Sequence, residues 1–238
     1  MKNGISVYTG LNCSLEENLS LIENAAAIGL KRLFTSTIIP ESASDNFEVE
    51  FSTMLTTAID NDFEIILDVT PETMSALDFI LDIEQITPRL DDGFNPMQIA
   101  ALSHARHIMI NASTIDEELL LNLMNFKADF SNISALHNFY PHVHTGLNVS
   151  YFQHQNCLLK SFDIAVGAFV ASLEGRRRPP FNEGLPTVEC TRNLTVNFTS
   201  RYLTALGVDF IIISDSLPTT KECSFLTDLN AGEVILEI

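Results

Sequence analysis

Short runs of apolar residues recur along the chain, and segments with helical spacing lie between them. The runs have the length of β-strands: GISVY, RLFTS, EIILDV, QITPRL, IMINA, ISALH, IAVGAFV and DFIIIS. In the first intervening segment, residues 14–29, Leu15, Leu19, Ile22 and Ala26 recur at intervals of three and four, which predicts a helix with one apolar face. The pattern therefore predicts a repeated unit of strand, loop and helix.

The ends of the first helix also have recognisable signals. Ser14 followed by Glu17 fits a capping box, and Gly29 fits a C-terminal stop. A second helix, around residues 45–61, has an apolar face formed by Phe47, Phe51, Leu55 and Ile59. The helices thus present an apolar face toward the strands.

This rhythm predicts an α/β fold. About eight such units in 238 residues match a (β/α)₈ TIM barrel, which typically takes about 250 residues, and we expect the barrel to occupy residues 1–229. A doubly wound open sheet is the alternative, because alternation alone does not show closure. The first loop, YTGLNCS, has no Gly-x-Gly-x-x-Gly and the chain has no P-loop, which removes the usual reason to prefer a nucleotide-binding sheet.

The last residues, 230–238, break the rhythm. Their sequence NAGEVILEI predicts a ninth strand after a turn. We expect either the first strand of a further domain or a tail strand on the barrel surface.

The net charge of the chain disfavours some classes of binding partner. Lys and Arg number 13 against 31 Asp and Glu, and the formal net charge of -18 disfavours binding to nucleic acid or to an anionic membrane. An anionic small molecule would need a local basic pocket. The cysteines have no Cys-x-x-Cys spacing, so they suggest neither a zinc knuckle nor a disulfide framework.

The N-terminal sequence MKNGISVYTG has only a short apolar patch, far less than a signal peptide needs. No apolar run approaches the about 20 residues of a transmembrane helix. We therefore expect a cytoplasmic protein, and the sequence leaves homo-oligomer formation open.

In a TIM barrel, the carboxyl ends of the strands and the loops after them carry the chemistry. The side chains expected at these strand ends are polar: Ser6, Tyr8, Thr35, Ser36, Asp68, Arg89, Asp91, Asp92, Asn111, Ser113, His137, Asn138 and Asp215. Hydrogen-bonding groups together with carboxylates predict a site for a polyhydroxylated ligand.

Two of these carboxylates follow neighbouring strands. Asp68 ends the apolar run EIILDV, and Asp91 follows the next strand. Neighbouring strand ends can bring two carboxylates within the about 5 to 10 Å that glycoside hydrolysis uses. Arg89 lies on the same strand face as Asp91 if alternation persists, and its guanidinium is expected to pair with the negative charge of Asp91. The alternatives are a helix cap for Asp68 and a purely internal salt bridge for Arg89.

A long loop, residues 172–193, follows the seventh strand. Loops of more than about 12 to 15 residues inside a compact domain are commonly functional or disordered. Arg176, Arg177 and Arg178 form the densest basic cluster of the chain, and guanidinium groups suit phosphate or carboxylate, although a solvated charge run is the alternative. Glu183, on the same loop, is a third candidate acid.

The stretch ISALHNFYPHVHTGLNVS, residues 133–150, holds three histidines. His142 and His144 would share one side only in a strand, and Pro141 argues against a strand there, so we expect no metal site. At the end of the sixth strand, His137, Asn138 and Tyr140 are predicted to contact sugar hydroxyls and phosphate, with Thr145 assisting. His142 and His144 are expected to be bystanders.

Several motifs together resemble one family. FTSTIIPE, EIILDVTPE, PRLDDGF, INAST, LHNFYPHVHTGL and NEGLPTVECTRNL, in this order, are similar to those of the bacterial MupG family, the 6-phospho-N-acetylmuramidases, which are TIM barrels. The resemblance covers essentially the whole chain. It implies a cytoplasmic glycosidase, without a cofactor, that splits the disaccharide of 6-phospho-N-acetylmuramic acid and N-acetylglucosamine during peptidoglycan recycling.

The sequence departs from this family in two places. Family members usually carry a cyclophilin-like domain after the barrel, so residues 230–238 are expected to mark the start of such a domain. The RRRPP segment differs from the Gly-Pro-rich sequence expected in the family at this place. The prediction that Arg178 binds phosphate therefore rests on charge alone.

The predicted mechanism draws its acid and its partner from Asp68, Asp91 and Glu183. The 2-acetamido group of the substrate is an alternative to the second carboxylate. The residues expected to bind the phosphorylated amino-sugar disaccharide are Tyr8, Arg89, Asn111, His137, Asn138, Tyr140, Thr145 and Arg178. Two other classes stay open: a sugar-phosphate isomerase or aldolase, and a non-catalytic sugar-phosphate-binding barrel. A Schiff-base aldolase would need a lysine, and the strand ends offer none.

Overall fold

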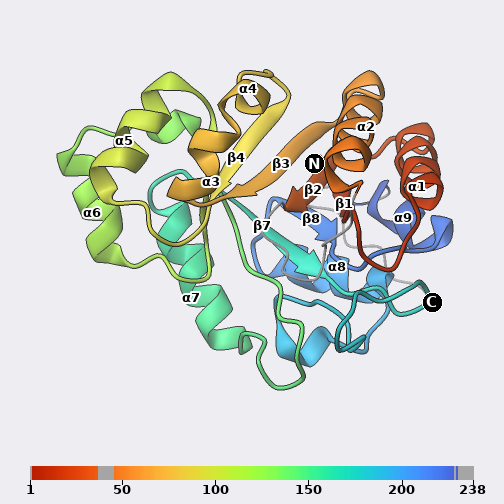
Figure 1. Cartoon of the computed structure of the whole chain (residues 1–238). Helices are drawn as coiled ribbons and strands as arrows, with labels where there is room; N and C mark the ends of the chain where they lie inside the picture. Colours follow the sequence, from red (N-terminus) through yellow and green to blue (C-terminus); the bar gives the residue numbers. More distant parts are fainter. Residues whose placement is uncertain (1, 37–45, 228, 230–238) are drawn as a thin grey trace.

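The computed structural model describes residues 2–36, 46–227 and 229, and its strands form one closed barrel (Figure 1). The strands are β1 Gly4–Ser6, β2 Arg32–Ser36, β3 Glu64–Val69, β4 Ile86–Leu90, β5 Ile108–Asn111, β6 Ile133–Leu136, β7 Ala165–Val170 and β8 Phe210–Ile213. Each strand pairs in parallel with the next, and β1 pairs in parallel with β8. The predicted TIM barrel is confirmed, and the open doubly wound sheet is excluded.

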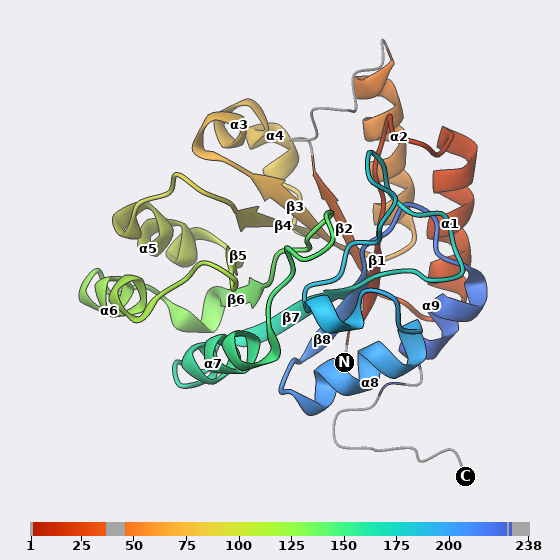
Figure 2. The same cartoon turned by 90° about the horizontal axis from the view of Figure 1, so that it is seen from below.

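Helices surround the barrel, as the view along it shows (Figure 2). They are α1 Leu15–Ala27, α2 Phe47–Asp60, α3 Pro71–Ala76, α4 Asp78–Leu81, α5 Pro96–Ala105, α6 Glu117–Asn125, α7 Val149–Lys160, α8 Val196–Ala205 and α9 Thr220–Thr227, with 3₁₀ turns η1 Phe130–Asn132 and η2 Glu189–Thr191. The predicted capping box of α1 is confirmed. The Glu17 amide donates to Ser14 Oγ at 3.2 Å, and the Ser14 amide donates to the Glu17 carboxylate at 2.9 Å.

Two further predictions concern the C-terminal residues and membrane-spanning helices. The predicted strand at residues 230–238 lies outside the described residues. Over the described ranges, no helix combines the length and apolarity that crossing a membrane requires.

Strand alternation divides the buried side chains into two cores. The larger core lies between the strands and the helices, and a smaller one fills the barrel: Tyr8, Phe34, Ile66, Met109, Leu136, Phe169, Phe210 and Ile212. Side chains two positions further along a strand point to the same side. Asp68, Asn111 and Asn138 are therefore directed inward, above this apolar layer. They lie at the C-terminal end of the barrel, here called the mouth, which comprises the strand ends and the loops that follow them.

Candidate active site

Arg89 of β4 organises the mouth from inside the barrel. It is buried, and its Nη1 donates to the Asp68 carboxylate at 2.7 Å. Its Nη2 donates to Asn138 Oδ1 at 2.6 Å and to the Leu136 carbonyl at 3.1 Å. A buried guanidinium is tolerated only when its donors are paired, so Arg89 fixes Asp68 and Asn138 relative to each other. The ion pair links Arg89 to Asp68, which corrects the expectation that Arg89 holds Asp91.

Asp68 is a carboxylate held at the mouth rather than a helix cap. The N-cap of α3 is Thr70, whose hydroxyl accepts from the Thr73 amide, so the capping alternative is wrong. The Asp68 side chain keeps 14% of its surface exposed. Burial raises the pKa of Asp68 above its usual value and the charge of Asp91 adds to this, while the Arg89 guanidinium opposes it. A carboxyl with a raised pKa suits proton donation.

Asp91 and Asn111 lie beside this pair. The Asp91 amide donates to the Val69 carbonyl at 3.0 Å, which places Asp91 next to the end of β3. Asp91 and Asn111 both line a cavity of about 230 Å³ with apolar walls that include Phe94 and Leu119. The structure thus brings Asp68, Arg89, Asp91, Asn111 and Asn138 to one side of the mouth.

His137 is placed differently from the prediction. Strand alternation sends Leu136 and Asn138 inward and His137 outward, where its ring packs on Phe152 of α7. Its Nδ1 is 3.1 Å from Ser113 Oγ and its Nε2 is 2.9 Å from Asn156 Oδ1. Burial lowers the pKa of His137 to about 4, so the ring is neutral at pH 7.

The predicted substrate contact from His137 is therefore wrong, because the side chain is fully buried and both ring nitrogens have protein partners. It supports the site indirectly. Ser113 Oγ, the partner of His137, also accepts from the Asn138 amide at 2.9 Å. His137 and Ser113 thus hold the backbone of a residue that faces the mouth.

Tyr8 also supports another residue of the mouth, Arg178. Its ring is buried at the mouth and its hydroxyl donates to the Ser214 carbonyl at 2.8 Å. Because Tyr8 is 1% exposed and its hydroxyl has a protein partner, the structure argues against the predicted substrate contact from Tyr8. The Arg178 guanidinium lies 4.9 Å from the centre of the Tyr8 ring and 5.4 Å from that of Phe139.

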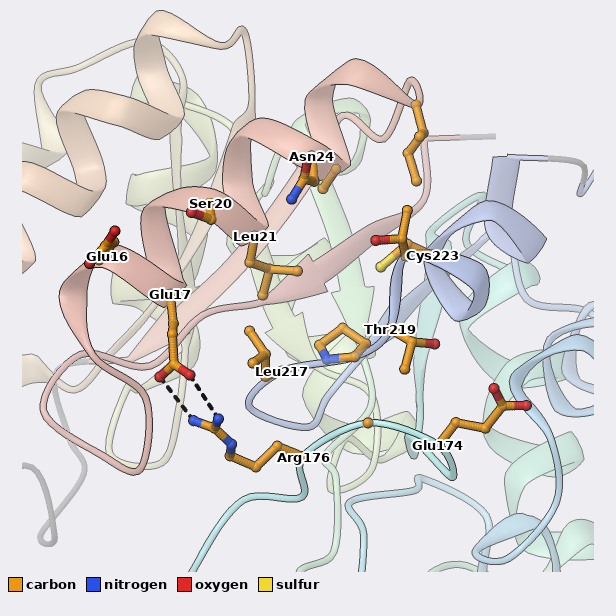
Figure 3. A pocket seen from close by; sticks show the side chains of 15 residues that line it. Glu16, Glu17, Ser20, Leu21, Asn24, Glu174, Arg176, Leu217, Thr219 and Cys223 are labelled. Atoms are coloured by element: carbon orange, nitrogen blue, oxygen red, sulfur yellow. Dashed lines mark hydrogen bonds and ion pairs between the residues drawn. The ribbon is translucent and has the colours of Figure 1, made fainter.

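The neighbouring arginines of the long loop serve other contacts. Arg176 donates twice to the Glu17 carboxylate, at 2.7 and 2.9 Å, on the wall of a groove between α1 and α9 (Figure 3). Arg177 donates to the Ser172 carbonyl at 3.1 Å, within its own loop. The alternative of a solvated charge run fits only Arg176, which is exposed, and Arg178 is the arginine of this cluster that the aromatic rings hold at the mouth.

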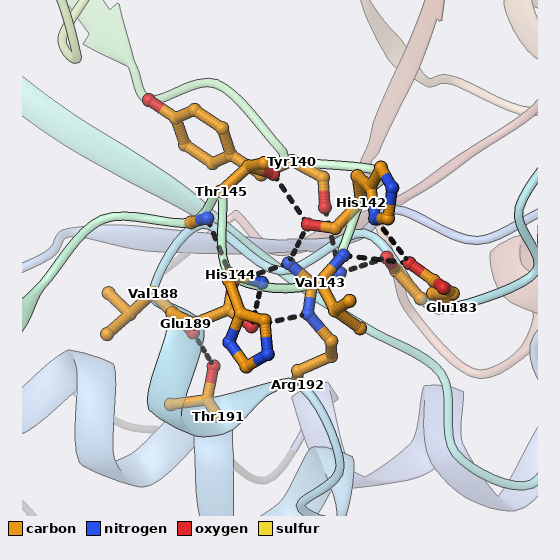
Figure 4. Close-up of polar contacts among 12 residues, drawn as sticks. Tyr140, His142, Val143, His144, Thr145, Glu183, Val188, Glu189, Thr191 and Arg192 are labelled. Atoms are coloured by element: carbon orange, nitrogen blue, oxygen red, sulfur yellow. Dashed lines mark hydrogen bonds and ion pairs between the residues drawn. The ribbon is translucent and has the colours of Figure 1, made fainter.

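The loop after β6 is braced from within (Figure 4). The buried Arg192 guanidinium donates to the carbonyls of Tyr140 at 2.9 Å, His142 at 2.9 Å and Gly184 at 2.8 Å. It also donates to Glu189 at 2.8 and 2.6 Å.

Glu189 completes this brace from the other side. Its carboxylate accepts from the amides of His144 at 3.0 Å and Gly146 at 2.8 Å. Arg192 and these amides lower the pKa of Glu189 to about 2. The prediction missed this brace, although the spacing Glu-x-x-Arg was visible in NEGLPTVECTRNL.

Within this loop, the Tyr140 amide donates to the Pro186 carbonyl at 3.0 Å, and burial raises the pKa of the half-buried Tyr140 hydroxyl. Thr145 is exposed, and its hydroxyl donates to the His142 carbonyl at 2.5 Å. Their predicted substrate contacts stay predictions.

We expect Arg192→Ala to lower the free energy of unfolding by about 3–5 kcal/mol, because it leaves a carboxylate and three carbonyls without their buried partner. Arg201→Ala is the matched control. Its guanidinium donates to Asn197 of the same helix, so its loss should cost less than about 1 kcal/mol. Urea unfolding followed by circular dichroism measures both, and equal losses would contradict the bracing role.

Glu183 contacts a different set of residues from the Asp68–Arg89 ion pair. Its carboxylate accepts from the Val143 amide at 2.7 Å and pairs with His142 Nδ1 at 3.0 Å, while the His142 ring stacks on Phe181. These partners lower the pKa of Glu183. A carboxylate held ionised in this way does not suit the role of proton donor.

The Glu183 carboxylate is also engaged with the Val143 amide and with His142, so Glu183→Gln should change kcat by less than about threefold, far from the 10²–10⁴-fold loss expected for a general acid. Initial rates on the phosphorylated disaccharide, with thermal melting as a check on folding, measure this effect. A loss of a hundredfold or more would return Glu183 to the catalytic set.

The described residues hold no cluster of three or more His, Cys, Asp or Glu side chains placed to bind a metal ion. His142 is engaged with Glu183, and the bystander role expected for His142 and His144 stays a prediction.

Comparison with known families adds one match. The model of the N-terminal domain of 6-phospho-N-acetylmuramidase matches residues 3–228. A search of curated proteins found no match.

Solved structures show the same fold over nearly the whole chain. An uncharacterized Bacillus cereus protein is 32% identical with a TM-score of 0.82, over 97% of this chain and 65% of its own. A conserved Enterococcus faecalis protein of unknown function is 28% identical with a TM-score of 0.80, over 94% of this chain and 64% of its own. The chain thus spans just under two thirds of each. A phospho-2-dehydro-3-deoxyheptonate aldolase from Thermotoga maritima, 13% identical with a TM-score of 0.61 over 94% of this chain and 67% of its own, shares the fold alone.

Proposed function

This chain belongs to the 6-phospho-N-acetylmuramidase family, and from that premise we propose that it is a glycoside hydrolase. Its substrate in this proposal is the disaccharide of 6-phospho-N-acetylmuramic acid and N-acetylglucosamine. The observation that carries the proposal is the family match over the barrel together with the Asp68–Arg89–Asn138 network at its mouth. A cytoplasmic place in the recycling of peptidoglycan fragments is part of the same proposal.

Asp68 takes the role of general acid. Hydrolysis of a glycosidic bond needs a proton on the leaving oxygen, and burial shifts the pKa of Asp68 upward, in the direction that suits a proton donor. Arg89 sets the direction of the carboxyl through its hydrogen bond at 2.7 Å. Asp91, at the end of the next strand, is the partner carboxylate. It acts either on the anomeric carbon or water, or on the acetamido group of the substrate.

The remaining groups bind the substrate. Arg178 takes the phosphate, because a ligand with this charge needs a local cation in a protein of net charge -18. Asn111 and Asn138 offer amide groups to sugar hydroxyls. The amide of Asn138 is held toward the mouth by Arg89, which donates to its Oδ1.

Replacement of Arg178 by alanine should raise KM for the phosphorylated disaccharide about tenfold or more and change kcat little, since a charge-assisted contact is worth about 1.5–3 kcal/mol. Arg176→Ala is the matched control, because its guanidinium pairs with Glu17 on the outer groove. Steady-state kinetics on both variants tests this. Equal KM values for wild type and Arg178→Ala would remove Arg178 from the phosphate site.

Calorimetric titration with the disaccharide, combined with detection of released N-acetylglucosamine, tests the function itself. We expect binding followed by release. Binding without release would support the non-catalytic alternative, and conversion without cleavage of the glycosidic bond would support an isomerase. The same disaccharide without its phosphate serves as the specificity control and should be a poor substrate.

A further inference from the structure

Asp215 is a buried carboxylate to which the roles above assign nothing. It follows β8 and has no exposed surface. Its Oδ2 accepts from the Ser172 amide at 2.8 Å, and its Oδ1 accepts from the Arg178 amide at 3.1 Å. Both amides belong to the long loop that follows β7. Asp215 therefore ties that loop to the end of β8 at two points.

A second carboxylate, Glu222 of α9, anchors only the start of the same loop. It is buried and accepts from Ser172 Oγ at 2.9 Å and from the amides of Leu173 at 2.8 Å and Glu174 at 3.1 Å. These contacts end before the arginine cluster. Backbone hydrogen bonds between Arg176 and Leu217, at 2.8 and 3.1 Å, and from Asn12 to the Arg177 carbonyl, at 2.9 Å, hold the cluster nearby. Asp215 is the carboxylate that accepts from the Arg178 amide itself.

The Arg178 side chain then extends from this fixed backbone over two rings. Its guanidinium carbon is 4.9 Å from the centre of the Tyr8 ring and 5.4 Å from that of Phe139. The Tyr8 hydroxyl donates to the carbonyl of Ser214, the residue before Asp215. One strand end therefore supports both the backbone of Arg178 and one of the rings that hold its guanidinium.

We propose that Asp215 is a positioning residue that holds the Arg178 guanidinium at the barrel mouth for the anionic group of the substrate. This proposal rests on the proposed function, in which Arg178 receives the phosphate. Asp215 touches no reacting atom, since both of its oxygens face backbone amides of the loop. Its effect on catalysis passes through Arg178.

The groups that face Asp215 predict how pH acts on this anchor. They come from the long loop, the segment after β1, and α9: Arg177, Arg178 and Tyr8, with Glu222 joined to Asp215 through Ser172. Burial raises the pKa of Asp215 to about 6, while the amides of Arg178 and Ser172 and the charge of Arg177 oppose the rise. Above this pH the carboxylate accepts both amides. Below it the protonated oxygen accepts poorly, so the anchor weakens as pH falls.

The test replaces Asp215 with asparagine, which keeps the shape but presents an NH₂ group to one of the two amides. We expect D215N to raise KM for the phosphorylated disaccharide roughly tenfold with kcat within about twofold of wild type, as for loss of ground-state binding. Ser216→Ala, a buried neighbour whose hydroxyl has no hydrogen-bond partner among the described residues, is the matched control and should change neither value. An unchanged KM in D215N overturns the proposal.

A double variant tests the route of the effect. If Asp215 acts through Arg178, D215N should add nothing to the KM of Arg178→Ala. Additive increases overturn the proposal. The pH profile gives a further readout: KM should rise below pH about 6 in wild type, partly because a phosphate monoester itself has a second pKa near 6. In D215N, KM should still rise at low pH, but only by the part that comes from protonation of the substrate phosphate.

Amide hydrogen exchange without substrate separates this proposal from the proposed function. D215N should speed exchange at Ser172 and Arg178 about tenfold or more, and Ser216→Ala should not. If D215N fails to fold, protection of the Arg178 amide in wild type should fall as pH is lowered through about 6, and constant protection overturns the proposal. If wild type cleaves nothing, the proposed function fails. Binding of glucosamine 6-phosphate that D215N weakens would then still support the positioning role, and equal binding would overturn it.

Discussion

Asp68→Asn should reduce kcat on the phosphorylated disaccharide by about 10²–10⁴-fold, the range expected when a general acid is lost. KM should change little, because asparagine still offers an oxygen to Arg89. Burial raises the pKa of the Asp68 carboxyl, and the buried Arg89 guanidinium fixes its orientation. Stopped assays of N-acetylglucosamine release measure the loss.

The pH dependence follows from the same shift. A general acid works while protonated, so kcat/KM should fall as pH rises through the raised pKa of Asp68. In Asp68→Asn this descending limb should disappear. A wild-type profile that lacks the limb would contradict the acid role.

Glu64→Gln is the matched control for Asp68→Asn. Glu64 lies on the same strand and the same face, paired with Arg32 at 3.1 Å, but at the opposite end of the barrel. Its replacement should leave kcat unchanged. Asp91→Asn should also lower kcat strongly, and near wild-type rates in both Asp68→Asn and Asp91→Asn would refute the assignment.

Arg89→Met should lower the free energy of unfolding by about 3–5 kcal/mol and also remove most activity. The methionine fills the space, but the Asp68 carboxylate, the Asn138 side-chain oxygen and the Leu136 carbonyl lose their donor. Both the acid and the inward-facing amide then lose their fixed directions. Urea unfolding and initial rates measure the two effects.

Arg32→Met is the matched control for this variant. Arg32 also points into the barrel and packs over the Phe210 ring, at 4.0 Å from its centre, at the end away from the mouth. It should lower stability while the kcat of the folded protein stays near that of wild type. If Arg89→Met and Arg32→Met affect kcat equally, the arrangement that Arg89 maintains is not the catalytic one.

The barrel was predictable because its signals are local. The period of the apolar runs predicts strands and helices, and the capping box at Ser14 marks a helix start without any tertiary contact. Asp68, Asp91, Asn111 and Asn138 were placed at the mouth by the same kind of signal, since they lie at or just after the ends of apolar strands and these ends form the mouth of a TIM barrel.

The errors in the site have physical reasons. His137 and Asn138 are neighbours in sequence, yet strand alternation sends only Asn138 inward, and the position of Leu136 in the barrel core could have shown this. The partner of Arg89 depends on strand register, in which Arg89 lies opposite Asp68.

The long loop was beyond prediction for another reason. Arg176 and Arg178 are two residues apart, but one meets Glu17 from a segment more than 150 positions away in sequence and the other meets the rings of Tyr8 and Phe139. The anchor at Asp215 likewise depends on amides that no sequence pattern marks. Such contacts appear only once the chain is folded.

The crystal structure of Asp68→Asn with the intact phosphorylated disaccharide tests the central claim most directly. We expect the glycosidic oxygen within hydrogen-bonding distance of residue 68 and the phosphate against the Arg178 guanidinium. A disaccharide bound with its glycosidic oxygen far from residue 68, or with its phosphate away from Arg178, would contradict the account.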